Sequence, residues 1–207
     1  MIEPRVRAAL EPANASALDL ACCEGWFSHR LLDWGASRVV GIDVRENNIR
    51  RAKLLREHFR IPEARLELVH SDVFDVDPLA LGTFEVVLVL GLIYHVENPM
   101  GLLRLARQCT RGLCVVESQL TRQTAPIVHG NGREAELHEA EGSVAIFIEE
   151  GWNPIASTGQ VLSLIPNRTA LAQMVRAAGF EHVEFADSSA AHNQQYVRGD
   201  RAVLFAY

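Results

Sequence analysis

The feature that most constrains this chain is an apolar segment that enters a turn of small residues and is followed by a second apolar segment ending in an acid. The first segment and its turn read Ala17-Leu18-Asp19-Leu20-Ala21-Cys22-Cys23-Glu24-Gly25, and the second reads Val39-Val40-Gly41-Ile42-Asp43. A buried strand, a tight turn that opens a helix, and a second strand ending in an acid form the first βαβ unit of nucleotide-binding folds. The acid of such a unit accepts hydrogen bonds from a ribose diol. The pattern therefore predicts a cofactor site near the start of the chain.

Strand-like and helix-like patterns alternate from residue 16 to residue 117, as a parallel sheet with covering helices requires. The predicted strands are short, apolar and bounded by Gly, Asp, Pro or Ser, and they span residues 17–21, 38–42, 65–69, 84–90 and 113–116. Two further strands, at residues 182–185 and 202–206, are joined by a polar loop and predict a hairpin-like return. The pattern indicates an α/β fold.

Three helices are predicted between these strands from the three- or four-residue spacing of their apolar positions. The first spans residues 46–58 and ends before Pro62, and the second opens at Asn98-Pro99, a favourable cap and first turn. The third begins at residue 167 and is closed by Gly179, a typical left-handed cap. Each helix has one apolar face that can lie on the sheet.

Residues 118–160 break this rhythm with five glycines, two histidines and a cluster of acids. Because loops on a rigid scaffold carry recognition, we interpret this segment as an insertion on the acceptor side of the site. The chain has 207 residues and 48% hydrophobic content, enough for one buried core, so we expect a single domain over residues 1–207.

The charge balance and the apolar runs limit the partners. A formal net charge of −6 makes nucleic acid an unlikely main partner, although a few arginines can form a local basic patch. No stretch reaches the roughly 18 apolar residues of a membrane span, and the amino terminus lacks the apolar core of a secretion signal. We expect a cytoplasmic protein without a membrane partner that acts on a small molecule, and a homo-oligomer is possible.

Beyond the first unit, the chain resembles the class I S-adenosylmethionine (SAM)-dependent methyltransferases. Ser71-Asp72-Val73-Phe74 is similar to the adenine-contacting segment of that family, and residues 84–95 are similar to its fourth strand and the edge of its active site. Ala178-Gly179-Phe180 and the two strands that follow resemble its closing antiparallel hairpin. The resemblance implies a Rossmann-like, seven-stranded, mostly parallel sheet with helices on both faces, and SAM as the cofactor.

Carried over by position, the resemblance implies that Asp43 binds the ribose hydroxyls and that Asp72 and Val73 contact the adenine. Asp19 and the turn through Gly25 would hold the methionine part, since a carboxylate attracts the sulfonium and the ammonium in a partly dry site. The complete set of predicted cofactor residues is Asp19, Ala21, Cys22, Cys23, Gly25, Phe27, Asp43, Val44, Asn48, Ser71, Asp72, Val73, Leu90, Gly91 and Tyr94.

The chain departs from the family pattern in this turn. Ala21 and Cys23 stand where members commonly carry glycine, which leaves Gly25 as its only glycine. Both side chains are small, so the backbone can still approach the cofactor, provided neither position needs a positive φ.

On the acceptor side, His95 follows the fourth strand and is the first candidate for a general base, with His129 of the insertion as the second. His95 can equally cap the next helix or line the cofactor pocket. The predicted substrate contacts are Tyr94, His129, Phe147, Trp152 and Asn153. The aromatic ones can instead form a small core of the insertion itself.

Glu134, His138 and Glu141 fall at helical spacing, a pattern that can bind a divalent metal but is more often a solvated helix face. We predict no metal site.

The leading hypothesis is methyl transfer to a small-molecule acceptor, at an oxygen nucleophile. The alternatives are a non-catalytic partner subunit, an NAD-dependent dehydrogenase, which lacks support because Gly-x-Gly-x-x-Gly is absent, and an RNA or protein methyltransferase.

Overall fold

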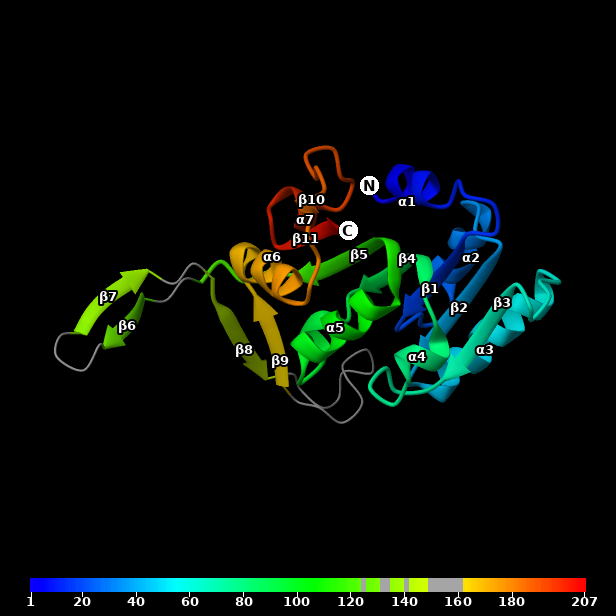
Figure 1. The fold of residues 1–207 in the computed structure, drawn as a ribbon, viewed down its shortest axis with the longest axis horizontal. Helices are drawn as coiled ribbons and strands as arrows, with labels where there is room; N and C mark the ends of the chain where they lie inside the picture. The colour runs from blue at the N-terminus through cyan, green and yellow to red at the C-terminus, as the bar shows by residue number, and fades with distance from the viewer. Residues whose placement is uncertain (124–125, 131–134, 140–141, 149–161) are drawn as a thin grey trace.

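The computed structural model describes residues 1–123, 126–130, 135–139, 142–148 and 162–207, and the side chains of residues 126–130 and 135–139 lie outside that description (Figure 1). Its centre is a seven-stranded sheet of order β10-β11-β5-β4-β1-β2-β3. The strands are β1 (Ser16–Leu20), β2 (Arg38–Asp43), β3 (Leu66–His70), β4 (Phe84–Leu90), β5 (Thr110–Gln119), β10 (Val183–Phe185) and β11 (Arg201–Ala206). The expected Rossmann-like α/β fold is confirmed.

Strand pairing gives the sheet its polarity. β3, β2, β1, β4 and β5 are parallel neighbours, whereas β11 is antiparallel to both β5 and β10. The order of the strands reverses between β1 and β4, and ligands of open α/β sheets bind beyond the carboxyl ends of the strands at such a switch point. Because β11 runs the opposite way, its first residue, Arg201, lies at this same edge opposite Gln119 of β5.

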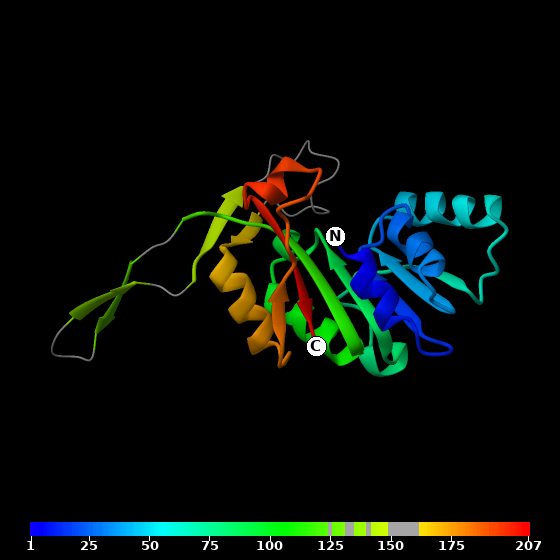
Figure 2. The same cartoon turned by 90° about the horizontal axis from the view of Figure 1, so that it is seen from above.

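Helices cover both faces of the sheet, as Figure 2 shows. The helices are α1 (Glu3–Ala9), α2 (Trp26–Asp33), α3 (Glu46–His58), α4 (Pro78–Leu81), α5 (Pro99–Cys109), α6 (Arg168–Ala177) and α7 (Gln194–Val197), with a 3-10 turn η1 (Ile93–His95). Val6, Leu31 and Ile49 of α1, α2 and α3 belong to one buried cluster, and Leu102 and Leu171 of α5 and α6 belong to another. Burial of these two apolar layers fixes the positions of the carboxyl ends of the parallel strands, which we call the rim of the sheet.

Helix caps follow the sequence signals. Asn98 accepts a hydrogen bond from the Gly101 N–H (2.8 Å) at the start of α5, as predicted. Gly179, just past α6, has the expected left-handed conformation with φ of 106°. The helix predicted for residues 46–58 has these bounds in the structure.

Several boundaries differ from prediction. β1 begins at Ser16 and ends at Leu20, so Ala21 lies outside it, and β3 and β10 begin one residue later than predicted. β5 is extended at both ends, reaching Gln119 and so entering the segment read as an insertion, because it pairs with both β4 and β11. The helices α1, α4 and α7 were not predicted, since all three are short and have too few apolar positions to show a helical period.

The segment after β5 contains two two-stranded antiparallel sheets. One pairs β6 (Pro126–Gly130) with β7 (Ala135–Glu139), and this hairpin projects away from the main sheet (Figure 1). The helix suggested by the spacing of Glu134, His138 and Glu141 is wrong at His138, because this residue lies in strand β7, which pairs with β6. Glu134 and Glu141 lie outside the described residues. The other sheet pairs β8 (Val144–Ile148) with β9 (Leu162–Pro166), and β9 packs against η1 at the rim.

Among the described residues, no helix is both long and apolar enough to cross a bilayer.

Candidate functional site

Asp19 lies near the end of β1, one of the two strands that flank the switch point. It is only 3% exposed, and its Oδ2 accepts a hydrogen bond from the Ser28 hydroxyl of α2 (2.7 Å). Burial raises the pKa of Asp19 to about 7, the charge of Asp43 adds to this, and the Ser28 hydrogen bond opposes it. An approaching cation would favour the ionised form of this carboxyl.

The turn between β1 and α2 is built from left-handed backbone. Ala21 has φ of 61°, Cys23 of 50° and Gly25 of 83°, so the condition set from the sequence, that neither Ala21 nor Cys23 needs a positive φ, is not met. For a residue with a Cβ, this conformation costs about 1–2 kcal/mol. The turn is held by hydrogen bonds from the Cys22 N–H to the Ile42 carbonyl (2.9 Å) and from the Gly25 N–H to the Cys22 carbonyl (2.8 Å). The chain therefore keeps the turn geometry without two of the glycines.

Asp43 ends β2, as predicted, and is 4% exposed. Its Oδ2 accepts from the Cys23 N–H (2.9 Å), and its Oδ1 accepts from the Arg45 N–H (2.9 Å) and the Asn48 side chain (3.1 Å). These bonds join the ends of β1 and β2 and the start of α3 around one carboxylate. Since a carboxylate offers about four lone-pair sites, one site on Oδ2 is left beyond these three bonds.

The segment after β3 lies beside Asp43. The Ser71 N–H donates to the Asp43 carbonyl (3.1 Å), and Asp72 accepts from the Phe74 N–H (2.9 Å). Val73 is 6% exposed, whereas Val44 is 39% exposed at the same edge. Asp43 and Asp72 therefore share one edge of the sheet, as binding of a single adenosyl group requires. Their roles in binding stay predictions.

The end of β4 supplies Leu90 and Gly91, and η1 follows with Tyr94 and His95. Gly91 has φ of 70°, and a Cβ at this position would lie 3.7 Å from Oε2 of Glu117 and 3.7 Å from the Tyr94 hydroxyl. The rings of Tyr94 and His95 lie 4.2 Å apart between centroids. Tyr94 is 5% exposed and accepts a hydrogen bond from Nη2 of Arg201 (3.0 Å).

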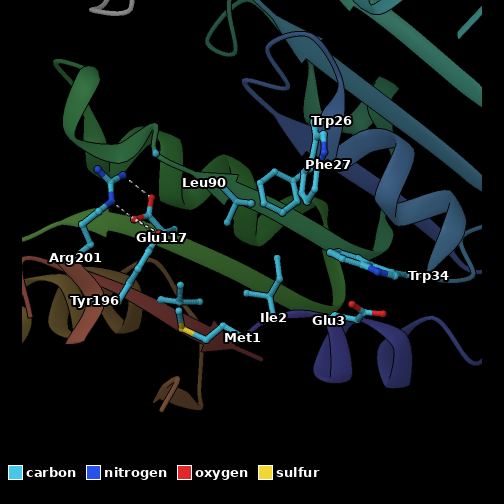
Figure 3. Close-up of a pocket in the computed structure, with 12 residues that line it drawn as sticks. Met1, Ile2, Glu3, Trp26, Phe27, Trp34, Leu90, Glu117, Tyr196 and Arg201 are labelled. Carbon is cyan, nitrogen blue, oxygen red and sulfur yellow. Dashed lines mark hydrogen bonds and ion pairs between the residues drawn. The ribbon is translucent and has the colours of Figure 1, made fainter. Parts of the chain in front are cut away.

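A pocket of about 510 Å³ opens at the carboxyl ends of β4 and β5 (Figure 3). We call it the rim pocket, and the described residues that line it are Met1, Ile2, Glu3, Trp26, Phe27, Trp34, Leu90, Gly91, Glu117, Tyr196, Arg201 and Val203. Its size is typical of a small-molecule site. It shares Phe27, Leu90 and Gly91 with the predicted cofactor residues, so it adjoins the predicted cofactor site.

Of the predicted acceptor-side residues, those whose side chains the structure describes do not line the rim pocket. His95 and Phe147 are not among the described residues that line the rim pocket, and Phe147 is 55% exposed on β8. His129 lies in β6 on the projecting hairpin, and its side chain is outside the description. Trp152 and Asn153 lie outside the described residues. The catalytic and substrate-binding roles of these residues stay predictions.

The sequence interpretation missed the polar side chains of the rim pocket, namely Glu117, Tyr196 and Arg201. One signal was available: Leu113 and Val115 point to the α1 face of β5, and period-two alternation calls for another apolar residue at position 117. An acid at that position breaks the pattern and marks a polar site at the end of a buried strand.

Comparisons with known proteins agree with this geometry. The fold and the carboxylates at successive strand ends define a doubly wound α/β protein with a site for an adenosyl cofactor. A family model described as a methyltransferase domain matches residues 18–115. The N-terminal domain of EvdMO1 was solved with S-adenosylhomocysteine (SAH) bound and is 25% identical to this chain, with a TM-score of 0.71. The match covers 100% of this chain and 80% of that one. The chain is similar to SAM-dependent methyltransferases and shares their Rossmann-like fold.

Curated relatives include tRNA U34 carboxymethyltransferases. The protein from Psychromonas ingrahamii is 27% identical over 82% of this chain, and the one from Actinobacillus succinogenes is 30% identical over 48% of it. The chain spans only 45% and 30% of the length of these two relatives. A methyltransferase from Mesorhizobium loti, 19% identical with a TM-score of 0.63 over 98% of this chain and 95% of that one, shares the fold.

Proposed function

We propose that this chain transfers a methyl group from SAM to an oxygen atom of a small-molecule acceptor. The observation that carries the proposal is the rim pocket, which is large enough for a small organic molecule and begins at Leu90 and Gly91, where the predicted cofactor site ends. A molecule in this pocket would lie beside the reactive end of a bound cofactor.

The residues at the strand ends fit an adenosyl cofactor. Asp43 and Asp72 lie on one edge and offer carboxylate oxygens to hydroxyl and amine donors, and Asp19 offers a buried carboxyl to an ammonium. When bound, SAM supplies an electrophilic methyl carbon and a good leaving group. The protein then has to align the acceptor with that carbon and exclude water, and alignment alone accounts for much of the rate of such a displacement.

A small-molecule acceptor is favoured by the walls of the rim pocket, which are mainly apolar and aromatic. A relative at 26% identity was solved in the presence of SAH and D-fucose, which also favours a small hydroxylated acceptor. The second candidate substrate is an RNA, because the curated relatives act on tRNA U34. The net charge of −6 opposes that candidate, since RNA binding relies on neutralising phosphates.

Isothermal titration calorimetry with SAM and with SAH tests the first part of the proposal. We expect both to bind, and we expect NADH not to bind. Absence of SAM and SAH binding would contradict the proposal. Filter binding with bulk tRNA separates the two acceptors: binding at physiological salt would favour the RNA candidate, and its absence would favour a small molecule.

His95→Ala tests the base predicted from sequence. If His95 removes a proton from the acceptor, this substitution should lower kcat by about 100-fold or more and leave the Kd for SAH unchanged. Equal kcat would remove His95 from the mechanism.

A further inference from the structure

Glu117 and Arg201 form a buried ion pair in the rim pocket. Their side chains are 7% and 17% exposed. Arg201 donates from Nε to Oε1 of Glu117 (2.6 Å) and from Nη2 to Oε2 (2.9 Å), so the contact is bidentate. Tyr196 of α7 donates its hydroxyl to Oε1 (3.0 Å). Three separate elements, β5, β11 and α7, therefore converge on one carboxylate.

The position of this pair follows from strand register. Glu117 is the direct neighbour of Leu90 on β4 and of Val203 on β11, and it points to the same face as Val115. That face is apolar along the strands until it reaches the rim, where Glu117 and Arg201 replace aliphatic side chains. Desolvating two charges largely cancels their attraction, so apolar residues would serve stability about as well at this place. A role in ligand binding gives a reason for the pair.

The Glu117 carboxylate has hydrogen-bonding capacity left over. Among the described residues, Oε1 accepts two hydrogen bonds and Oε2 accepts one. A carboxylate offers about four lone-pair sites, so Oε2 can accept one more donor. Gly91 lies beside this oxygen and leaves it uncovered, because an added Cβ would lie in van der Waals contact with Oε2, at 3.7 Å. Oε2 is therefore a hydrogen-bond acceptor that the pocket can present to a ligand.

The other residues of the rim pocket indicate what kind of ligand fits beside Glu117. Glu117 and Arg201 lie toward one end, Phe27 and Trp34 lie toward the other, and Leu90 lies between them (Figure 3). Arg201 compensates the charge of Glu117, so this pair does not call for a charged ligand. Flat apolar and aromatic walls with the Glu117 carboxylate at one end fit a neutral, ring-bearing molecule with a hydroxyl group.

We propose that Glu117 is a catalytic residue that binds the hydroxyl of a neutral, ring-bearing acceptor and takes its proton, and this inference rests on the proposed function. The acceptor oxygen forms a bond to the methyl carbon, the sulfur keeps the electron pair of the broken carbon–sulfur bond, and the hydroxyl proton passes to Oε2 of Glu117. The products are a methyl ether and SAH. Tyr196 and Arg201 are positioning residues, because they fix the carboxylate without contacting the acceptor oxygen.

The test uses phenol and anisole as probes, because anisole is the methyl ether of phenol and has the same ring without the hydroxyl donor. Their Kd values are measured by calorimetry on the full chain saturated with SAH. For the natural sequence we expect phenol to bind about tenfold more tightly than anisole, because anisole leaves Oε2 without its partner. Glu117→Gln should reduce this preference at least threefold without changing the Kd for SAH.

Two further variants keep the test decisive. Glu85→Gln is the matched control, because Glu85 also pairs with an arginine, Arg111 (2.8 Å), but lies outside the rim pocket, and it should keep the full preference. If Glu117→Gln does not fold, the double variant Glu117→Met with Arg201→Met removes both charges and should bind phenol and anisole alike.

The outcomes separate the two proposals. Absence of SAH binding contradicts the proposed function. SAH binding together with equal affinities for phenol and anisole, or with no binding of either probe, contradicts the role of Glu117. A phenol preference that survives in Glu117→Gln or in the double variant also overturns it.

Discussion

The two halves of the rim are built in different ways. In the half that we propose binds the cofactor (the cofactor half), at the ends of β1, β2 and β3, carboxylates hold the backbone of neighbouring turns, as Asp43 does with the amides of Cys23 and Arg45. In the half that we propose binds the acceptor (the acceptor half), at the ends of β4 and β5 and the start of β11, the polar groups bond to other side chains, as Glu117 does with Arg201. Backbone-based geometry suits a cofactor common to a family, whereas side-chain pairs can change with the acceptor.

The largest expected effect lies in the acceptor half. Arg201→Met leaves Glu117 buried without its counter-ion, which should lower the free energy of unfolding by about 3–5 kcal/mol. Arg111→Met, which removes the more exposed partner of Glu85 (59% exposed), should cost less than about 1 kcal/mol. Urea denaturation measures both. Equal losses would show that the buried pair is no different from a surface pair.

The next effect is a pH dependence in the cofactor half. The folded state keeps the Asp19 proton up to its pKa of about 7, whereas the unfolded chain loses it near the ordinary value of about 3.9. Between these values folding binds a proton, so stability should fall as pH rises toward 7, by up to about 1.4 kcal/mol per pH unit. Above that pH the loss is complete.

Asp19→Asn should remove this contribution, and urea denaturation at pH 5, 6 and 7 compares its slope with that of the natural sequence. Asp33→Asn, a change at an exposed acid (59%) of α2, is the control and should keep the slope. Parallel slopes for the natural sequence and Asp19→Asn would refute the raised pKa.

A smaller effect separates the halves by ligand. Asp43→Asn replaces an acceptor of backbone amides and should raise the Kd for SAH about tenfold or more while leaving phenol binding to the SAH-saturated protein unchanged. Asp77→Asn is the matched control, because Asp77 also accepts from the amide two residues later, that of Leu79 (2.9 Å), but caps α4. An unchanged Kd in Asp43→Asn, measured by calorimetry, would exclude Asp43 from the cofactor site.

The smallest effect concerns the left-handed turn. Ala21→Gly relieves a Cβ at positive φ and should raise the free energy of unfolding by up to about 1 kcal/mol, without changing the Kd for SAH. Arg60→Gly, at φ of 53° outside the turn, should give a similar gain. A loss of stability in Ala21→Gly would show that other contacts of Ala21 outweigh the strain.

The acids and the turn of the cofactor half could be predicted from the sequence because the signals that mark them are local. Asp19, the small-residue turn and Asp43 lie on consecutive elements, and each strand is marked by a run of apolar residues. The same reasoning placed Asp72 at the end of the next strand, and the hydrogen bond from Ser71 to Asp43 confirms that these strand ends meet. It did not detect the positive φ of Ala21 and Cys23, because glycine is the residue that signals this conformation.

The polar residues of the acceptor half could not be predicted from the sequence. Glu117 and Arg201 are 84 residues apart in the chain and meet only because β11 returns antiparallel to β5. From the sequence, acceptor-side roles were predicted for His129 and Phe147 of the insertion. The described residues that line the rim pocket instead come from α1, α2, α7, the sheet and the segments next to them.

By itself, the sequence determined the order along the chain of the seven strands of the main sheet, the α/β class and the acids at the ends of the first strands, because periodicity and turn chemistry act over a few residues. Only the tertiary structure decided which side chains form the pocket next to them. The physical reason is that register between strands distant in sequence depends on burial of the whole sheet, and a local pattern does not contain that information.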